Sequence, residues 1–201
     1  MITNIRNLTA ADLEDIDRLL MTAYGRPSSF KSELPKLGFV EQEKSLVLQQ
    51  ETTVQHLSSY ELVSKLRSTD LIALAAFDTP LFGADRHAVF AAFLKELPNR
   101  AFIAREPTGQ IIGYLFAQPQ RLGPWAAITS TAAEALLAKV LQLSFDNTPY
   151  VLVPGSNQTA IALLKRYGFI EKRSLSHMHR GRSTVPGQRI MLYGMANFAL
   201  G

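Results

Sequence analysis

The stretch "VPGSNQTAIALLKRYGFIE", residues 153–171, joins the end of an apolar run to a helix and to the exit from that helix. The run itself, "PYVLVP" at 149–154, has the length and apolarity of a strand buried on both faces. Ser156 is placed to cap the helix, and Gly168 is placed to end it in a left-handed conformation. The stretch therefore predicts strand, helix and strand in succession.

Working outward, capping signals and hydrophobic periodicity predict the remaining elements. The capping boxes expected to open helices are Thr9 with Asp12 and Thr131 with Glu134. A β-hairpin is expected around Pro107-Thr108-Gly109. The predicted strands are 2–8, 52–57, 100–106, 109–118, 125–130, 169–179 and 187–200, and residues 39–50 are expected to form an extended run. The predicted helical segments are 9–24, 58–78 with a break near Ser68-Thr69, 84–97 and 131–141.

Composition limits the class of protein. With 201 residues, 47% of them hydrophobic and 19% charged, the chain can bury a substantial core. There is no cysteine, which excludes disulfides and thiolate chemistry. We expect a cytoplasmic protein without a membrane partner, because no apolar run reaches spanning length and the N-terminus lacks the pattern of a secretory signal.

The net charge of +4 is concentrated between residues 165 and 189. Apolar residues alternate with these basic residues at strand period, which favours a solvated strand face over a nucleic-acid site. His177 and His179 share one face of the predicted strand, but no third ligand is nearby, so no metal site is expected.

Residues 153–171 resemble the GNAT N-acetyltransferases, and because the order of the predicted elements is also the GNAT order, the resemblance covers roughly residues 50–201. In that family a strand leads into a helix that begins Asn-x-x-Ala and ends at Gly-Phe, as "NQTA" and "GF" do here. The resemblance implies an α/β (α+β) fold, with a mixed, mostly antiparallel central sheet and helices on both faces. "FGADR" at 82–86 and "YGMANFALG" at the end of the chain resemble the C-terminal half of tandem GNAT proteins.

A second Gly-Phe phrase occurs near the start of the chain. "ELPKLGFVEQ" (33–42) repeats the pattern of "LLKRYGFIEK" (163–172). We interpret residues 1–49 as a truncated N-terminal GNAT-like segment and residues 50–201 as a complete GNAT-like domain, although chance similarity of so short a phrase is the alternative. A truncated domain leaves apolar surface and a strand edge near "KSLVLQQ" (44–50), so a homodimer is expected.

The resemblance also implies a cofactor site for acetyl-CoA. Acetyl transfer needs donors for a developing oxyanion, and the cofactor pyrophosphate needs backbone amides at a helix start. GNAT proteins present those amides on a Gly-rich turn, and the corresponding segment here, "ITSTAAEALLAK", contains no glycine. We expect the cleft where the strands "WAAITS" and "PYVLVP" separate, and the candidate cofactor-binding residues are Ile128, Thr129, Ser130, Thr131, Asn157 and Ala160. For Asn157, a second cap of the helix is the alternative role.

The catalytic acid is the second departure from the family. Many relatives carry a Tyr four residues before the Gly of Gly-Phe, where this chain has Leu164. Tyr167 is the nearest candidate acid, with core packing as its alternative role. Glu106, Glu134 and His87 are the candidates for a base, and the sequence does not choose among them.

Two functions are therefore compatible with the sequence. One is an N-acetyltransferase that moves an acetyl group from acetyl-CoA to an amine of a small molecule or a protein. The other is a non-catalytic GNAT-like module that binds a ligand or a partner.

Overall fold

The computed structural model describes residues 35, 38–52, 62–180 and 187–197. The chain divides into two compact units, residues 1–41 with 178–183 and residues 42–177 with 184–201. The described helices and strands lie in the second unit, except for the ends of two strands at residues 39–41 and 178–180. The sequence-predicted elements between residues 2 and 24 lie outside the described residues, and so does most of the strand expected at 52–57.

An eight-stranded sheet forms the centre of the second unit, with the order β2-β3-β4-β5-β6-β1-β7 and with β8 paired to β5. Its strands are β1 (Phe39–Gln50), β2 (Val63–Lys65), β3 (Ala101–Arg105), β4 (Ile111–Ala117), β5 (Arg121–Ala127), β6 (Tyr150–Pro154), β7 (Phe169–Arg180) and β8 (Leu192–Gly194). The strands β5 and β6 pair in parallel. The pairs β1–β6, β2–β3, β3–β4, β4–β5 and β5–β8 are antiparallel. The expected mixed, mostly antiparallel sheet is confirmed.

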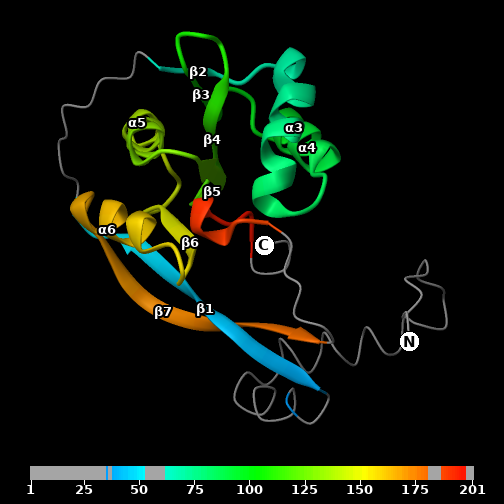
Figure 1. The fold of residues 1–201 in the computed structure, drawn as a ribbon. Coiled ribbons are helices and arrows are strands. Elements are labelled where there is room, and N and C mark those ends of the chain that lie inside the picture. The colour runs from blue at the N-terminus through cyan, green and yellow to red at the C-terminus, as the bar shows by residue number, and fades with distance from the viewer. Residues whose placement is uncertain (1–34, 36–37, 53–61, 181–186, 198–201) are drawn as a thin grey trace, which may run out of the picture. The chain divides into compact units, whose positions relative to one another are not determined.

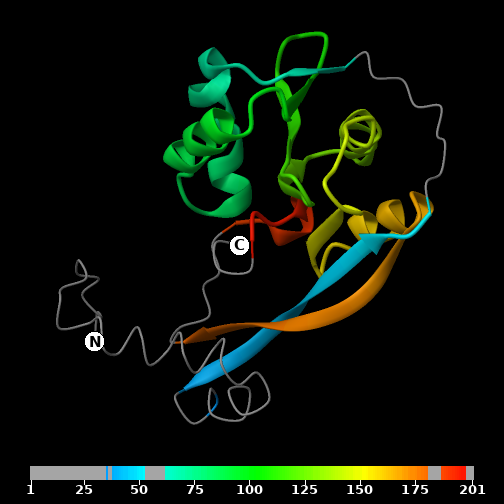
Figure 2. The ribbon, with the colours of Figure 1, turned by 180° about the vertical axis from the view of Figure 1, so that it is seen from behind.

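Four α-helices lie among the described residues: α3 (Leu71–Phe82), α4 (His87–Glu96), α5 (Ser130–Val140) and α6 (Gln158–Arg166). Two 3-10 turns, η3 (Ser68–Asp70) and η4 (Arg189–Met191), precede α3 and β8. The helices α3 and α4 cover one face of the sheet, and α5 covers the other (Figures 1 and 2). No helix among the described residues is long and apolar enough to cross a membrane.

Successive side chains along the strands point to opposite faces of the sheet, and helices cover both faces. In β3, Phe102 and Ala104 pack on the side of α5 and α6, whereas Ala101 and Ile103 pack on the side of α3 and α4. Every residue of β4 is buried, because helices cover both of its faces.

Local signals located several elements but not all of them. The hairpin around Pro107-Thr108-Gly109 is confirmed, as is the left-handed exit at Gly168, where φ is 79°. The expectation of helical turns over 58–78 is wrong for 63–65, which pair with β3 as β2. Pairing with a formed neighbour outweighs weak local preference in such a short segment.

The extended run expected at 39–50 is confirmed as β1, but its position in the sheet was not predicted. Residues 45–49 pair with β6, and β1 lies between β6 and β7 in the sheet. The expected free edge near residues 44–50 is therefore absent, because both neighbouring positions are filled by other strands of the same sheet.

A buried polar network fixes the α3–α4 connection to the sheet. The Arg86 guanidinium donates to both carboxylate oxygens of Asp78, at 2.8 and 2.7 Å, and to the Tyr114 hydroxyl at 2.7 Å. That hydroxyl donates in turn to Asp78 at 2.6 Å. Burial raises the pKa of Tyr114 well above its usual value, with Arg86 opposing and Asp78 reinforcing the shift, so the hydroxyl remains a donor. The guanidinium also lies 3.6 Å from the ring centroid of Phe82.

Replacing Arg86 by methionine should destabilise the fold severely. The change leaves the Asp78 carboxylate, which is 0% exposed, without its cation, and such a loss costs about 3–5 kcal/mol. Urea denaturation measures the free energy of unfolding. The control is Arg105→Met, which breaks an ion pair with Asp70 whose side chains are 31% and 20% exposed and should cost at most ~1 kcal/mol. Equal losses in the two variants would contradict the assignment of the network as a buried anchor.

Candidate functional site

The parallel strands β5 and β6 separate after a short contact. They pair only at Arg121 with Tyr150 and Leu122 with Val151, although both strands continue beyond these pairs. Beyond these pairs, the backbone N–H and C=O groups of β5 and β6 that face each other are too far apart to form hydrogen bonds between the two strands. The expected separation of the two strands is therefore confirmed, and it creates a gap in the sheet that something must fill.

The chain's own C-terminal segment fills this gap. The strand β8 pairs with β5 through Trp125 with Gly194 and Ala126 with Leu192. On the other side, the Met195 amide donates to the Leu152 carbonyl of β6 at 2.8 Å. The red segment in Figure 1 thus lies between β5 and β6. The sequence predicted a strand in this region but not its position.

The side chains of this segment belong to the core. Leu192, Tyr193, Met195 and Ala196 are all at most 4% exposed. The Tyr193 ring lies 5.1 Å from that of Trp125, measured between centroids, and burial raises the pKa of Tyr193. The Nε1 donor of Trp125 is buried without an acceptor among the described residues.

Two glycines allow the backbones to approach this closely. A Cβ added to Gly194 would lie 2.8 Å from the Leu122 carbonyl oxygen and 3.2 Å from Val151 Cγ1. One added to Gly123 would lie 2.4 Å from the Met195 carbonyl oxygen. The gap therefore has no spare width while the segment occupies it.

The predicted cofactor residue Asn157 is engaged inside the chain. It is the N-cap of α6, where its Oδ1 accepts the Ala160 amide at 2.9 Å. Its Nδ2 donates to the Leu192 carbonyl at 3.0 Å, which ties the start of β8 to α6. The expectation that Ser156 caps α6 is wrong, because Asn157 takes this role. The alternative role expected for Asn157, as a helix cap, is confirmed. Ala160 is fully buried in the same core.

The other predicted cofactor residues lie together at the start of α5. Ile128, Thr129, Ser130 and Thr131 are exposed there, directly after β5. Thr129 is the N-cap, and its Oγ1 accepts the Ala132 amide at 3.1 Å, so the expected capping box at Thr131 is wrong by two residues. Backbone amides at an exposed helix start can hold an anion.

The predicted acid Tyr167 is 2% exposed and packs in the core. Its hydroxyl donates to Glu134 of α5 at 3.1 Å, and Arg166 pairs with the same carboxylate at 2.8 Å. Tyr167 is the C-cap of α6 and Asn157 is the N-cap, so the structure places these two candidates at opposite ends of one helix. The contact with Glu134 was not predicted, because it joins helices distant in sequence.

Glu43 of β1 holds η4, the turn that directly precedes β8. Its carboxylate pairs with Arg189 of η4 and accepts the Ser156 amide at 3.1 Å. Partial burial alone would raise the pKa of Glu43, but the hydrogen bonds from Ser156 and Arg189 and the charge of Arg189 outweigh it and lower the pKa.

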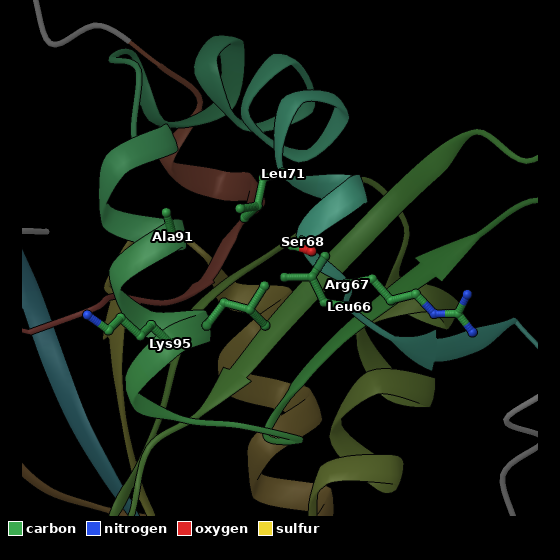
Figure 3. A pocket seen from close by; sticks show the side chains of 7 residues that line it. Leu66, Arg67, Ser68, Leu71, Ala91 and Lys95 are labelled. Atoms are coloured by element: carbon green, nitrogen blue, oxygen red, sulfur yellow. The ribbon is translucent and has the colours of Figure 1, made fainter.

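A surface pocket lies elsewhere, between η3 and α4, with a volume of about 420 Å³ (Figure 3). Its floor is apolar, and the Arg67 side chain extends away from Lys95. None of the sequence-predicted site residues lines it. The lining residues are Leu66, Arg67, Ser68, Leu71, Ala91, Leu94 and Lys95.

In the described conformation the gap does not fit the arm of acyl-CoA. The backbone groups that an extended ligand would use are already paired with residues 192–195. The exposed start of α5 remains the part of the site that fits an anionic group.

Comparison with known proteins identifies the fold. The sequence profile of a family described as acetyltransferase (GNAT) domain matches residues 74–194. No curated protein sequence is significantly similar to this chain.

Solved structures with the same fold are distant in sequence. A putative acetyltransferase from Pyrococcus horikoshii superposes with a TM-score of 0.71 at 22% identity, covering 88% of this chain and 58% of that one. A GCN5-related N-acetyltransferase from Sphaerobacter thermophilus gives 0.56 at 16% identity, covering 80% of this chain and 57% of that one. This chain therefore spans little more than half the length of these two structures.

Stability should fall in acid partly because of Glu43. Its folded-state pKa is lowered, so its contribution is present above the unfolded value of ~4.3 and is lost as pH falls through the folded value. The advantage of the wild type over Glu43→Gln in unfolding free energy should therefore shrink between about pH 5.5 and pH 3. The control is Glu96→Gln, which removes the same charge at an exposed position and shows how much of the change comes from net charge alone. An advantage that is independent of pH would refute the role of the carboxylate charge.

Proposed function

Because the chain belongs to the GNAT acetyltransferase family, we propose that it is an acyl-CoA-dependent N-acetyltransferase that acts on an amine of a small molecule or a protein. The observation that carries this proposal is the separation of β5 from β6 next to the exposed start of α5. Two diverging strands beside an exposed helix start would suit an extended ligand with an anionic group once residues 192–195 had left the gap. The identity of the amine is left open.

A second candidate function is supported by the closed gap. A GNAT-like module that binds a partner without catalysing transfer needs no free cleft, and here residues 192–196 fill it with buried side chains. The missing Gly-rich turn and the hydrogen bond from Tyr167 to Glu134 favour the same candidate.

The sequence-based domain division stays a proposal, with residues 1–49 as a truncated GNAT-like segment and 50–201 as the complete domain. A cytoplasmic location and a homodimer are likewise proposed. Support for the homodimer now rests on β7, an outer strand of the sheet, rather than on β1. Within residues 169–177 this strand is exposed or half-exposed after its first residue, and an outer strand of this kind can pair with a second chain.

Binding of acetyl-CoA tests the transferase proposal. Titration calorimetry at millimolar ligand should give measurable but weak heat with the wild type. Ser130→Pro removes one helix-start amide at a position where proline preserves the helix, so affinity should fall about tenfold or more, since a hydrogen bond to a charged group contributes ~1.5–3 kcal/mol. Ser130→Ala keeps the amide and is the matched control.

Transfer of a labelled acetyl group to a panel of amines completes the test. Heat with acetyl-CoA together with transfer to at least one amine supports the enzyme. If the folded wild type shows neither heat nor transfer, and a variant in which residues 192–196 are displaced from the gap also shows neither, the binding module is the better assignment.

A further inference from the structure

We propose that residues 188–197 are a built-in occupant of the gap between β5 and β6, and that acyl-CoA enters this gap only when the segment leaves. The ligand named here rests on the proposed function. The structural part of the inference rests on the pairing, packing and anchoring of the segment.

Pairing makes the segment and an extended ligand competitors. The segment takes backbone partners on both sides, through Trp125 and Ala126 of β5 and through the Leu152 carbonyl of β6. The arm of acyl-CoA is an extended chain with amide groups, which would need the same donors and acceptors. One set of backbone groups cannot serve both chains at once.

Packing makes the two occupants mutually exclusive in space. An added Cβ at Gly194 already meets backbone at 2.8 Å, and one at Gly123 meets it at 2.4 Å. A second chain therefore has no room beside the first. If the segment left, Trp125 would lose the Tyr193 ring, and its buried Nε1 donor, which has no acceptor among the described residues, would gain access to a ligand carbonyl.

Side chains hold the segment at both of its ends. Near the start, Asn157 Nδ2 donates to the Leu192 carbonyl, and Arg189 pairs with Glu43. Near the end, Gln118 Nε2 donates to the Ala196 carbonyl at 3.0 Å. With these clamps and its buried side chains, the segment is out of the gap in only a small fraction of molecules. The apparent association constant for acyl-CoA is the intrinsic constant multiplied by that small fraction, so binding is much weakened.

A wedge variant tests this competition directly. Gly194→Ala places a methyl group against the Leu122 carbonyl and should push the segment out, so acetyl-CoA should bind at least tenfold more tightly than to the wild type. The control is Ile190→Ala in the same segment, which removes a side chain that is 57% exposed and should leave affinity unchanged. Circular dichroism confirms that both variants are folded.

A disulfide between the segment and β5 tests the same idea in the opposite direction, because it holds the segment in the gap. The chain has no cysteine, so Ala126→Cys with Leu192→Cys, a facing pair in the β5–β8 register, creates the only pair of thiols. Oxidation should abolish acetyl-CoA binding, and reduction should restore it to at least the wild-type level. Hydrogen exchange at the Met195 amide should accelerate when excess acetyl-CoA is added to the wild type.

The outcomes separate the inference from the proposed function. Equal binding by the oxidised and reduced forms of the double-cysteine variant would overturn the inference and leave the transferase proposal standing. A folded Gly194→Ala variant that binds no acetyl-CoA would overturn the transferase proposal and, with it, acyl-CoA as the competing ligand. Tighter binding by this variant together with loss of binding in the oxidised double-cysteine variant supports both.

Discussion

Where two strands diverge inside a sheet, their facing backbone N–H and C=O groups need other hydrogen-bond partners. The rest of this site depends on which groups supply those partners. Buried backbone groups that lack water must pair with something. Here β5 and β6 part after two residue pairs, and a three-residue strand from the C-terminal region supplies the partners. The Asn157–Leu192 hydrogen bond, the close approaches at Gly123 and Gly194 and the Trp125–Tyr193 contact all involve this inserted segment.

The same unit uses segments far apart in the chain on the other side of β6 as well. Residues 45–49 pair there, and β7 lies beyond them. β6 therefore has a neighbour from near the start of the chain on one side and β5 with the C-terminal segment on the other. The repeated Gly-Phe phrase introduces both β1 and β7, which are adjacent strands of one sheet, and this adjacency gives the repetition a structural meaning.

Signals that depend on neighbouring residues predicted much of this fold. The turn at Pro107-Thr108-Gly109 requires only local geometry, and so does the exit at Gly168. The position of β8 could not be predicted, because a strand of three residues has no usable periodicity and its partners are distant in sequence. At the candidate site, the sequence predicted the helix start near Ser130, but it did not predict that β8 lies in the gap between β5 and β6. Helix caps were displaced by one or two residues, since several hydroxyl and amide side chains compete at each start.

The pairing of β1 with β6 has a consequence for the order of folding. Residues 45–49 precede their partners at 150–154 by half the length of the chain. Such non-local pairing forms slowly, because the intervening chain must be ordered before the contact is made. During synthesis an apolar, β-prone segment, "SLVLQQ", emerges long before the strand that will cover it. Until then it is a surface to which chaperones or other nascent chains can bind.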